Sequence, residues 1–228
     1  MLNKKLLIRY ITREIFGLAG MGTALFWSAG SLTWLPAWGE VLVNAAWLTG
    51  MFFIMLRKHP ALLAYRLGPK KGGAGWDTLI VSLMGLAQLA RCIIAGLDFR
   101  YSWTGRIQPV FQVLGWIIGA GGYLLLLYAV YANPFFSQVY RVQKEREHHV
   151  IDSGPYRFVR HPGYLGALIY EASLPLLFAS RIVIVPCIIF CLIVIIRTAI
   201  EDRSLQKELP GYTQYSDKVH FRLIPGLW

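Results

Sequence analysis

The stretch IQPVFQVLGWIIGAGGYLLLLYAVYA, residues 107–132, decides the fold. It contains no Asp, Glu, Lys, Arg or His, and it is longer than the ~20 apolar residues that a helix needs to cross a bilayer. A helix on the surface of a soluble protein would keep one polar face toward water, and this stretch has none. It therefore predicts an all-α, polytopic transmembrane helix bundle.

Further apolar segments flank this run and bring the prediction to about six spans. They lie at about residues 15–36, 38–56, 77–97, 164–179 and 182–196. Residues 1–132 are thus expected to form an N-terminal four-span membrane region. The last two segments have roughly 15 residues each, fewer than the ~20 of a full crossing. Because only Ser180 and Arg181 separate them, we expect a short helical hairpin.

The composition supports a membrane protein and argues against a nucleic-acid-binding one. Charged residues make up 15% of the 228-residue chain, against about a quarter in soluble domains. The net charge is +11, but the basic residues lie in short loops between apolar runs, and no nucleic-acid-binding motif accompanies them. Positive charge in such loops favours contact with anionic lipid of the bilayer.

The loop charges also predict an orientation. By the positive-inside rule, the more basic loops face the cytoplasm, so both termini and the long 133–163 loop are expected there. The first span has no small-residue cleavage site before it and is expected to be retained, in a bacterial inner membrane or the endoplasmic reticulum. The basic residues on the predicted cytoplasmic side are Lys4, Lys5, Arg9, Arg13, Arg57, Lys58, Arg66, Lys70, Lys71, Arg141, Lys144, Arg146, Arg157, Arg160, Arg203, Lys207 and Lys218.

Several features inside or beside the spans are expected to serve packing. Cys92, Cys187 and Cys191 lie in apolar runs without a CxxC spacing, which favours packing over a disulfide framework or a zinc site. The small residues at 115, 119 and 122 are expected to let helices approach closely. Near the span ends, where an aromatic belt is expected, stand Trp34, Trp38, Trp76, Trp103 and Trp228. Glu171 is costly inside a span, so it is expected to face a site or to pair with Arg91 or Arg197.

Two polar stretches carry the candidate chemistry. The first is HHVIDSGPYRFVRHPGY, His148 to Tyr164, in an irregular loop whose free backbone groups suit a polar ligand. The second is RTAIEDRSL, Arg197 to Leu205, in which Arg197 and Glu201 share one helix face. Taken alone, the second stretch could also be an ordinary ion pair at a helix end. In the first stretch, Arg157 and Arg160 could simply anchor the chain at the membrane interface.

Together these stretches, with GYTQYSDKV from Gly211 to Val219 and the closing Ile224-Pro225, resemble the isoprenylcysteine carboxyl methyltransferase family and its bacterial and archaeal relatives, which are related to phospholipid methyltransferases. The resemblance covers about residues 133–228 and implies a C-terminal catalytic region. It implies S-adenosylmethionine as cofactor, bound on the cytoplasmic side, and a lipophilic acceptor, most like the carboxylate of an isoprenylated cysteine. It implies no metal, although His148, His149 and His161 leave a metal cluster as an alternative.

The resemblance also assigns roles to residues. Glu201 would bind a polar group of the cofactor, and Arg197 would hold the acceptor carboxylate. Glu201 stands where the family often has the first of two glutamates, and Asp202 replaces the second with the same charge. The residues implied in cofactor binding are Gln143, His148, His149, Val150, Ile151, Tyr156, His161, Pro162, Gly163, Tyr164 and Glu201.

The chemistry of these residues is consistent with such roles. Tyrosine faces suit a sulfonium cation and a purine, and a carboxylate accepts hydrogen bonds from ammonium or ribose hydroxyl groups. A carboxylate acceptor is ionised at neutral pH, so its methylation requires positioning and exclusion of water without a general base. A lipid amine N-methyltransferase would need a base, for which His161 is the candidate.

Two alternatives come from other classes. A membrane reductase of the sterol-reductase type has a similar C-terminal architecture and binds NADPH. A non-catalytic membrane scaffold would keep the fold and bind neither cofactor.

Overall fold

The computed structural model describes residues 4–67, 75–105 and 107–228. Within these ranges the chain forms helices, turns and loops, and none of the described residues lies in a strand. The all-α prediction is therefore confirmed. Lys70 and Lys71, which entered the orientation argument, lie outside the described residues.

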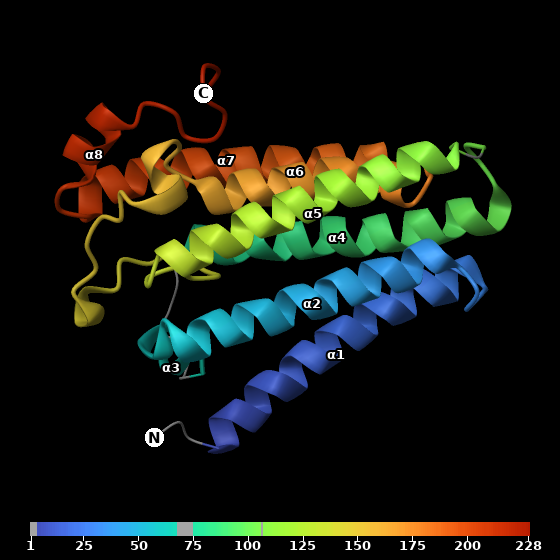
Figure 1. Ribbon diagram of the computed structural model, residues 1–228, viewed down its shortest axis with the longest axis horizontal. Helices are drawn as coiled ribbons and strands as arrows, with labels where there is room; N and C mark the ends of the chain where they lie inside the picture. Colours follow the sequence, from blue (N-terminus) through green and yellow to red (C-terminus); the bar gives the residue numbers. More distant parts are fainter. Residues whose placement is uncertain (1–3, 68–74, 106) are drawn as a thin grey trace.

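The long helices run alongside one another and form an elongated bundle (Figure 1). They are α1 (Lys4–Ala29), α2 (Leu35–Arg57), α4 (Gly75–Tyr101), α5 (Pro109–Ala132), α6 (Pro162–Leu177) and α7 (Ile184–Glu208). The short helical segments are α3 (Pro60–Leu67), η1 (Lys144–Arg146), η2 (Gly154–Arg157) and α8 (Tyr212–Lys218). We call the end of the bundle that carries residues 133–161 and 209–228 the loop end, and the opposite end the turn end.

The protein is an integral membrane protein by the length and composition of its helices. Among the described residues, α2, α4, α5 and α7 are each long and apolar enough to cross a bilayer. Large apolar side chains point outward along them, such as Ile117 (65% exposed) and Leu124 (66% exposed). The other two predicted spans are helices as well, although α1 and α6 lie outside this criterion.

The predicted hairpin is present, but its second arm is longer than expected. Helix α6 has 16 residues, whereas α7 has 25 and runs on through Arg197 and Glu201 to Glu208. The apolar segment ends near residue 196, and the helix continues past it, as the shared helix face of Arg197 and Glu201 predicted. The helix continues because Arg197 and Asp202 are buried against charged partners, Asp77 and Arg160, from other segments.

Helices α5 and α6 pack closely through the small residues predicted for this purpose. A Cβ added to Gly122 would lie 2.7 Å from the carbonyl oxygen of Gly166, and one added to Gly115 would lie 2.7 Å from the backbone nitrogen of Leu177. Both distances are far below van der Waals contact. The glycines therefore let the two backbones meet along most of α6, which confirms the packing prediction.

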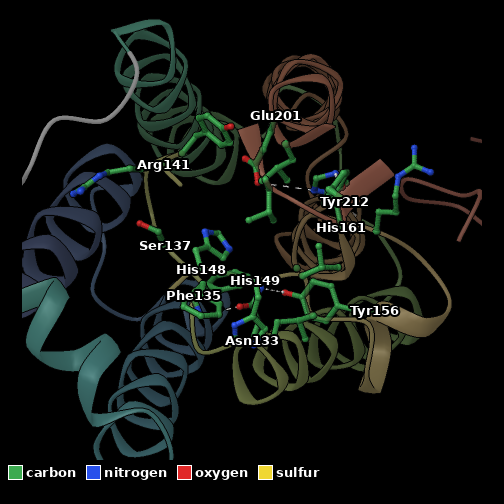
Figure 2. A pocket seen from close by; sticks show the side chains of 18 of the residues that line it. Asn133, Phe135, Ser137, Arg141, His148, His149, Tyr156, His161, Glu201 and Tyr212 are labelled. Carbon is green, nitrogen blue, oxygen red and sulfur yellow. Dashed lines mark hydrogen bonds and ion pairs between the residues drawn. The ribbon is translucent and has the colours of Figure 1, made fainter. Parts of the chain in front are cut away.

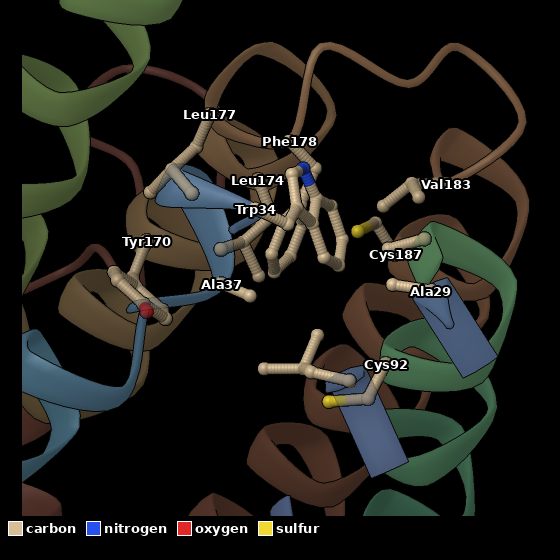
Figure 3. Packing of buried hydrophobic residues seen from close by; sticks show 12 residues of the cluster. Ala29, Trp34, Ala37, Cys92, Tyr170, Leu174, Leu177, Phe178, Val183 and Cys187 are labelled. Carbon is tan, nitrogen blue, oxygen red and sulfur yellow. The ribbon is translucent and has the colours of Figure 1, made fainter. Parts of the chain in front are cut away.

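The main apolar cluster lies at the turn end, between α1, α2, α4, α6 and α7 (Figure 3). Trp34 was expected in an aromatic belt, but it is 3% exposed and packs on Phe178, with ring centroids 5.4 Å apart. It is a core residue because the α1–α2 turn folds it inward under α6. Cys92 and Cys187 are buried in the same cluster, and all three cysteines are free thiols, as predicted.

Candidate functional site

The loop between α5 and α6 folds over the loop end of the bundle and is held there by buried polar side chains. The Gln143 side chain is fully buried, donates to the Phe135 carbonyl at 2.8 Å and accepts a hydrogen bond from Arg146. The Tyr140 backbone N–H donates to Asp77 of α4 at 2.6 Å. These contacts fix an irregular backbone, whose polar groups need such partners when they are buried.

A cavity lies beneath this loop, with an empty volume of about 820 Å³ counted out to its open mouth (Figure 2). Its lining comes from the loop, the start of α6, the end of α7 and α8. The lining residues are Asn133, Phe135, Phe136, Ser137, Val139, Tyr140, Arg141, His148, His149, Val150, Ile151, Tyr156, Arg160, His161, Gly163, Tyr164, Glu201, Leu205, Leu209, Tyr212 and Tyr215.

One wall of the cavity is aromatic. The ring of Phe135 stacks on His148, with centroids 4.3 Å apart, and meets His149 edge-on at 5.0 Å. Nδ1 of His148 accepts the Gln143 backbone N–H at 3.3 Å. Burial, with smaller effects from the nearby His149 and Arg146, lowers the pKa of His148 to about 4 from 6.5. His148 is therefore neutral at physiological pH and presents a flat, uncharged face.

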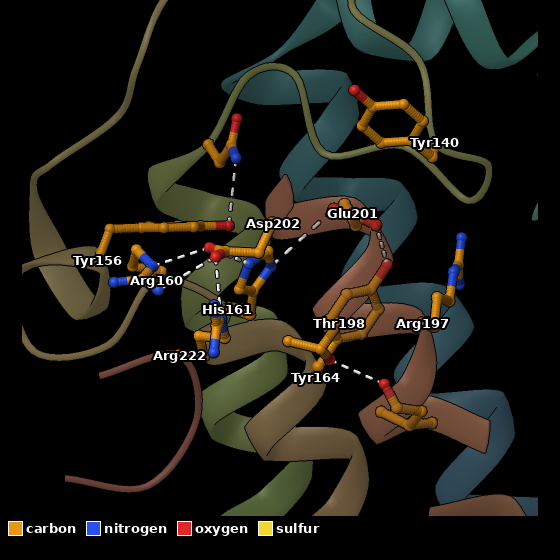
Figure 4. A network of polar contacts seen from close by, with 12 residues as sticks. Tyr140, Tyr156, Arg160, His161, Tyr164, Arg197, Thr198, Glu201, Asp202 and Arg222 are labelled. Atoms are coloured by element: carbon orange, nitrogen blue, oxygen red, sulfur yellow. Dashed lines mark hydrogen bonds and ion pairs between the residues drawn. The ribbon is translucent and has the colours of Figure 1, made fainter. Parts of the chain in front are cut away.

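Opposite this wall, Glu201 of α7 lies at the edge of the cavity. Its Oε2 accepts a hydrogen bond from the Tyr164 hydroxyl at 2.6 Å, and its Oε1 lies 4.0 Å from Nδ1 of His161 (Figure 4). Tyr164 and His161 stack, with ring centroids 5.7 Å apart. Because Glu201 is only partly buried, its carboxylate remains available to hydrogen-bond donors of a bound molecule.

Asp202, the next residue, does not line the cavity. Its carboxylate binds side chains from the segments that do. Arg160 makes two hydrogen bonds to its carboxylate, at 2.8 and 3.1 Å, and Arg222 donates at 2.8 Å (Figure 4). The Tyr212 hydroxyl donates at 2.9 Å, and Nε2 of His161 lies at 3.3 Å. One carboxylate thus ties the loop, the start of α6, α8 and the C-terminal tail to α7.

The sequence allowed Arg160 to be an anchor at the membrane interface, but in the structure it is a buried residue of the site. Its side chain is buried, and besides Asp202 it donates to the carbonyl oxygens of Val219 and His220, at 2.8 and 3.0 Å. The backbone N–H groups of Arg160 and His161 also donate to the tail, each at 2.9 Å. Arg157, in contrast, is exposed.

Arg197 lies one helical turn before Glu201, beside the cavity, but does not line it. Its Nε and Nη2 bind the buried carboxylate of Asp77, at 2.8 and 3.2 Å, and Nη2 also donates to the Gln138 carbonyl at 2.8 Å. Its Nη1 contacts the Met84 sulfur at 4.0 Å. Arg197 therefore does form an ion pair, but its partner is Asp77 and not Glu201.

The structure brings most of the predicted cofactor residues to one cavity. The runs at 148–151 and 163–164, together with Tyr156, His161 and Glu201, all line it. Three predicted site residues do not: Gln143 stabilises the loop from behind, Pro162 is the buried first residue of α6, and Arg197 binds Asp77. Pro162 suits its position because its fixed φ favours the first turn of a helix.

Other lining residues were missed by sequence reasoning. Phe135 and Asn133 precede the stretch His148 to Tyr164, and nothing in their spacing indicates that they contact a ligand. Tyr212 and Tyr215 belong to the GYTQYSDKV stretch, which was noted only as part of a resemblance. Their spacing of three puts both on one face of α8, which is the signal that was available. Tyr215 confirms this face by donating to the Tyr156 carbonyl at 2.7 Å.

Known proteins match the same part of the chain. Residues 114–207 match the model of the isoprenylcysteine carboxyl methyltransferase (ICMT) family. Two curated proteins, from Oryza sativa subsp. indica and subsp. japonica, are each 28% identical over 194 residues, which cover 77% of this chain and 93% of the relative. Both are named probable protein-S-isoprenylcysteine O-methyltransferase.

The matched segment contains the two motif stretches that build the cavity. It spans most of α5, the loop, α6 and nearly all of α7, and the longer matches to the rice proteins extend over most of the chain. The protein is a membrane methyltransferase, and its residues 114–207 are similar to the isoprenylcysteine carboxyl methyltransferase family.

Proposed function

We propose that the cavity at the loop end binds S-adenosylmethionine and that the enzyme transfers its methyl group to the carboxylate of an isoprenylated cysteine. The observation that carries the proposal is the convergence of both motif stretches on one cavity, with the aromatic His148 wall on one side and the Glu201 carboxylate on the other. The names of the rice relatives supply the acceptor class.

The residues present fit the cofactor. Glu201 has one oxygen bonded to Tyr164, which leaves acceptor capacity for an ammonium or hydroxyl group. The neutral rings of His148, Tyr156 and Tyr164 suit a purine and a cation. When bound, S-adenosylmethionine would supply an electrophilic methyl group attached to a sulfonium. The protein would hold the reactants in place and exclude water beneath the loop.

A carboxylate acceptor matches this site better than an amine. It is ionised at neutral pH, so no residue has to remove a proton before it reacts. His161, the candidate base for an amine acceptor, is buried and lies beside the carboxylates of Asp202 and Glu201 and the hydroxyl of Tyr212. These contacts give its side chain a structural role in the Asp202 cluster.

Arg197 is the proposed residue for the acceptor carboxylate. Its guanidinium lies 5.3 Å from the Tyr164 ring centroid, next to the cavity, and Nη1 faces only a sulfur among the contacts described above. A sulfur is a weak hydrogen-bond acceptor, so Nη1 retains donor capacity for a carboxylate. Asp77 would then act as the positioning residue that holds the guanidinium plane.

We propose further that the loop end faces the cytoplasm, with both termini, in a bacterial inner membrane or the endoplasmic reticulum. Residues 133–228 would form the catalytic region and residues 1–132 the membrane region before it. The loop charges support this orientation through the positive-inside rule.

Calorimetric titration and a methyl-transfer assay test the function. We expect the purified protein to bind S-adenosylhomocysteine and not NADPH, and to transfer label from S-adenosylmethionine to a farnesylated cysteine rather than to a phospholipid. Glu201→Gln should weaken S-adenosylhomocysteine binding at least about tenfold, because it loses a charge-assisted hydrogen bond. Arg197→Lys should retain cofactor binding and lower turnover of the farnesylated cysteine.

The exposed Asp217 of α8 offers a matched control, since Asp217→Asn also removes one carboxylate charge. It should bind S-adenosylhomocysteine as the unchanged protein does. Binding of NADPH alone would identify a reductase, and binding of neither molecule a scaffold; either result would overturn the proposal. Methylation of lipid amines alone would overturn the acceptor assignment.

A further inference from the structure

A second cavity lies within the membrane-spanning part, away from the loop end. Helices α1 and α2 close on the other helices at the turn end and diverge from them toward the loop end (Figure 1). The space where they diverge holds a cavity with an empty volume of about 1260 Å³, counted out to its mouth, lined by all six long helices. We call it the wedge cavity. Gly85, Gln88 and Leu89 of α4 line it and are exposed, so it opens sideways toward lipid.

The wedge cavity has polar groups on its inner wall. Arg91 of α4 binds Glu171 of α6 at 2.5 Å and Glu40 of α2 at 3.4 Å. Tyr170 donates a hydrogen bond to Glu40, and the Asn44 amide also donates to it, at 3.1 Å. Glu171 thus pairs with Arg91, one of the two partners expected from the sequence. Charged groups at this depth are costly and usually mark a functional site.

The network is complete around Glu40 but not around Glu171. Both oxygens of Glu40 accept hydrogen bonds. Oε1 of Glu171 is buried and has no hydrogen-bond partner, and neither has Nε of Arg91. Cys187 interacts with Glu171, but a thiol is a weak donor. A buried carboxylate oxygen without a strong donor costs free energy that a bound donor would recover.

The remaining lining is apolar. Leu18 and Met21 of α1, Leu48 of α2, Leu126 of α5 and Phe190 of α7 face the same space. Two carboxylates share one guanidinium, so the charged groups favour an incoming donor or cation over an anion. The wall therefore combines room for an alkyl chain with an acceptor for one polar group.

We propose that the wedge cavity binds an amphiphile whose polar end donates a hydrogen bond, from a hydroxyl or an ammonium group, to Oε1 of Glu171. Its chain would lie among the apolar residues and enter sideways past Gly85.

This ligand differs from the methyl acceptor proposed above. Glu171 follows Gly163, which lines the loop-end cavity, by eight residues along α6, a rise of roughly 12 Å at 1.5 Å per residue. A carboxylate acceptor would also meet the unpaired oxygen of Glu171 and be repelled. The two cavities thus select polar ends of different chemistry.

Equilibrium binding to the full chain in phosphatidylcholine nanodiscs tests the proposal, with empty nanodiscs as background. The probes are radiolabelled hexadecan-1-ol and hexadecylamine, and the competitors are hexadecyl methyl ether and palmitate. We expect saturable binding of the alcohol, the amine or both, without competition from the ether or palmitate. The arm that binds identifies the donor as hydroxyl or ammonium.

Two variants locate the site. Glu171→Gln should weaken binding at least about tenfold, because it loses the charge-assisted bond. Gly85→Leu leaves the ion pairs intact and fills the mouth, since a Cβ there meets nothing within 4 Å. Gly85→Leu should abolish binding of the probes. It tests the site independently of Glu171→Gln, in case that variant does not fold. Gly121→Leu on α5 is the matched control, because its Cβ also meets open space but it does not line the cavity.

Several results would overturn the proposal: no saturable binding, equal competition by the ether, preferential binding of palmitate, or unchanged binding in Gly85→Leu. Glu171→Gln and Gly85→Leu should both still bind S-adenosylhomocysteine. That measurement separates failure of this proposal from failure of the proposed methyl-transfer function.

Discussion

At the scale of single residues, Asp202 shows how one carboxylate organises a site that it does not enter. Asp202→Asn preserves the shape of the side chain and removes the charge that the buried Arg160 faces. Leaving one partner of a buried ion pair uncompensated typically costs about 3–5 kcal/mol, so we expect a lower melting temperature. S-adenosylhomocysteine binding should also weaken, because His161 and Tyr212 both line the cavity and contact Asp202.

Thermal unfolding in detergent and calorimetric titration measure the two effects. Asp217→Asn again serves as the control for the loss of one carboxylate. An Asp202→Asn protein with unchanged stability and affinity would contradict the role given to this cluster.

His148 carries the expected dependence on pH. In the folded protein its pKa is about 4, below its ordinary 6.5, so between these values the unfolded chain binds a proton that the folded one does not. Stability from this group is therefore complete above about pH 6.5 and declines as the pH falls toward 4. Protonation also removes the Nδ1 acceptor for the Gln143 N–H.

The measurement is the melting temperature between pH 7 and pH 4 for the unchanged protein and for His148→Asn, whose side-chain oxygen supplies an acceptor that does not titrate in this range. We expect a shallower decline in the variant. Identical curves would mean that other groups account for the whole acid sensitivity.

At the scale of helices, the α5–α6 contact depends on the absence of side chains. Gly122→Leu would place its Cβ 2.7 Å from two backbone atoms, the Gly166 oxygen and the Tyr170 nitrogen, which cannot rotate away. Overpacking of this kind costs about 1–3 kcal/mol or more. We expect a clear fall in melting temperature, against little change in Gly121→Leu, where a Cβ meets nothing within 4 Å. Equal effects would mean that the close α5–α6 contact is not the cause of the loss.

The helices also show what the sequence predicts and where it fails. Apolar runs located the long helices to within a few residues at most ends, because membrane burial requires uninterrupted hydrophobicity. The apolar run of α7 ends near residue 196, but the helix goes on to Glu208 through charged residues. Their partners are distant in the chain: Arg197 meets Asp77, and Asp202 meets Arg160 and Arg222. Hydropathy carries no information about such pairs.

The candidate site was likewise predicted only in part. Its residues within the two motifs were predicted, because a resemblance transfers residue by residue. Phe135 and Asn133 were not, because the fold of the loop brings them to the cavity. Gln143 and Arg197 were predicted as ligand contacts and do not line the cavity. Gln143 binds Phe135 and Arg146, and Arg197 binds Asp77 through Nε and Nη2, so only side-chain geometry shows which of their atoms remain for a ligand.

At the scale of the whole molecule, the orientation is the property most open to test. The basic residues near the loop end predict that this end faces the cytoplasm. A reporter enzyme that is active only in the cytoplasm, fused after Trp228, should be active. The same reporter inserted in the 178–183 turn should be inactive. The reverse pattern would require the cavity to face the other compartment.

Helix α6 touches both cavities of the molecule: Gly163 and Tyr164 line one, and Ala167, Tyr170 and Glu171 line the other. Its close glycine contacts with α5 leave it little freedom to bend between them. A ligand that displaced α6 at one end would therefore also shift it at the other. By thermodynamic reciprocity, each ligand would change the dissociation constant of the other by the same factor. The bilayer's own amphiphiles would then set how tightly the enzyme holds its methyl donor.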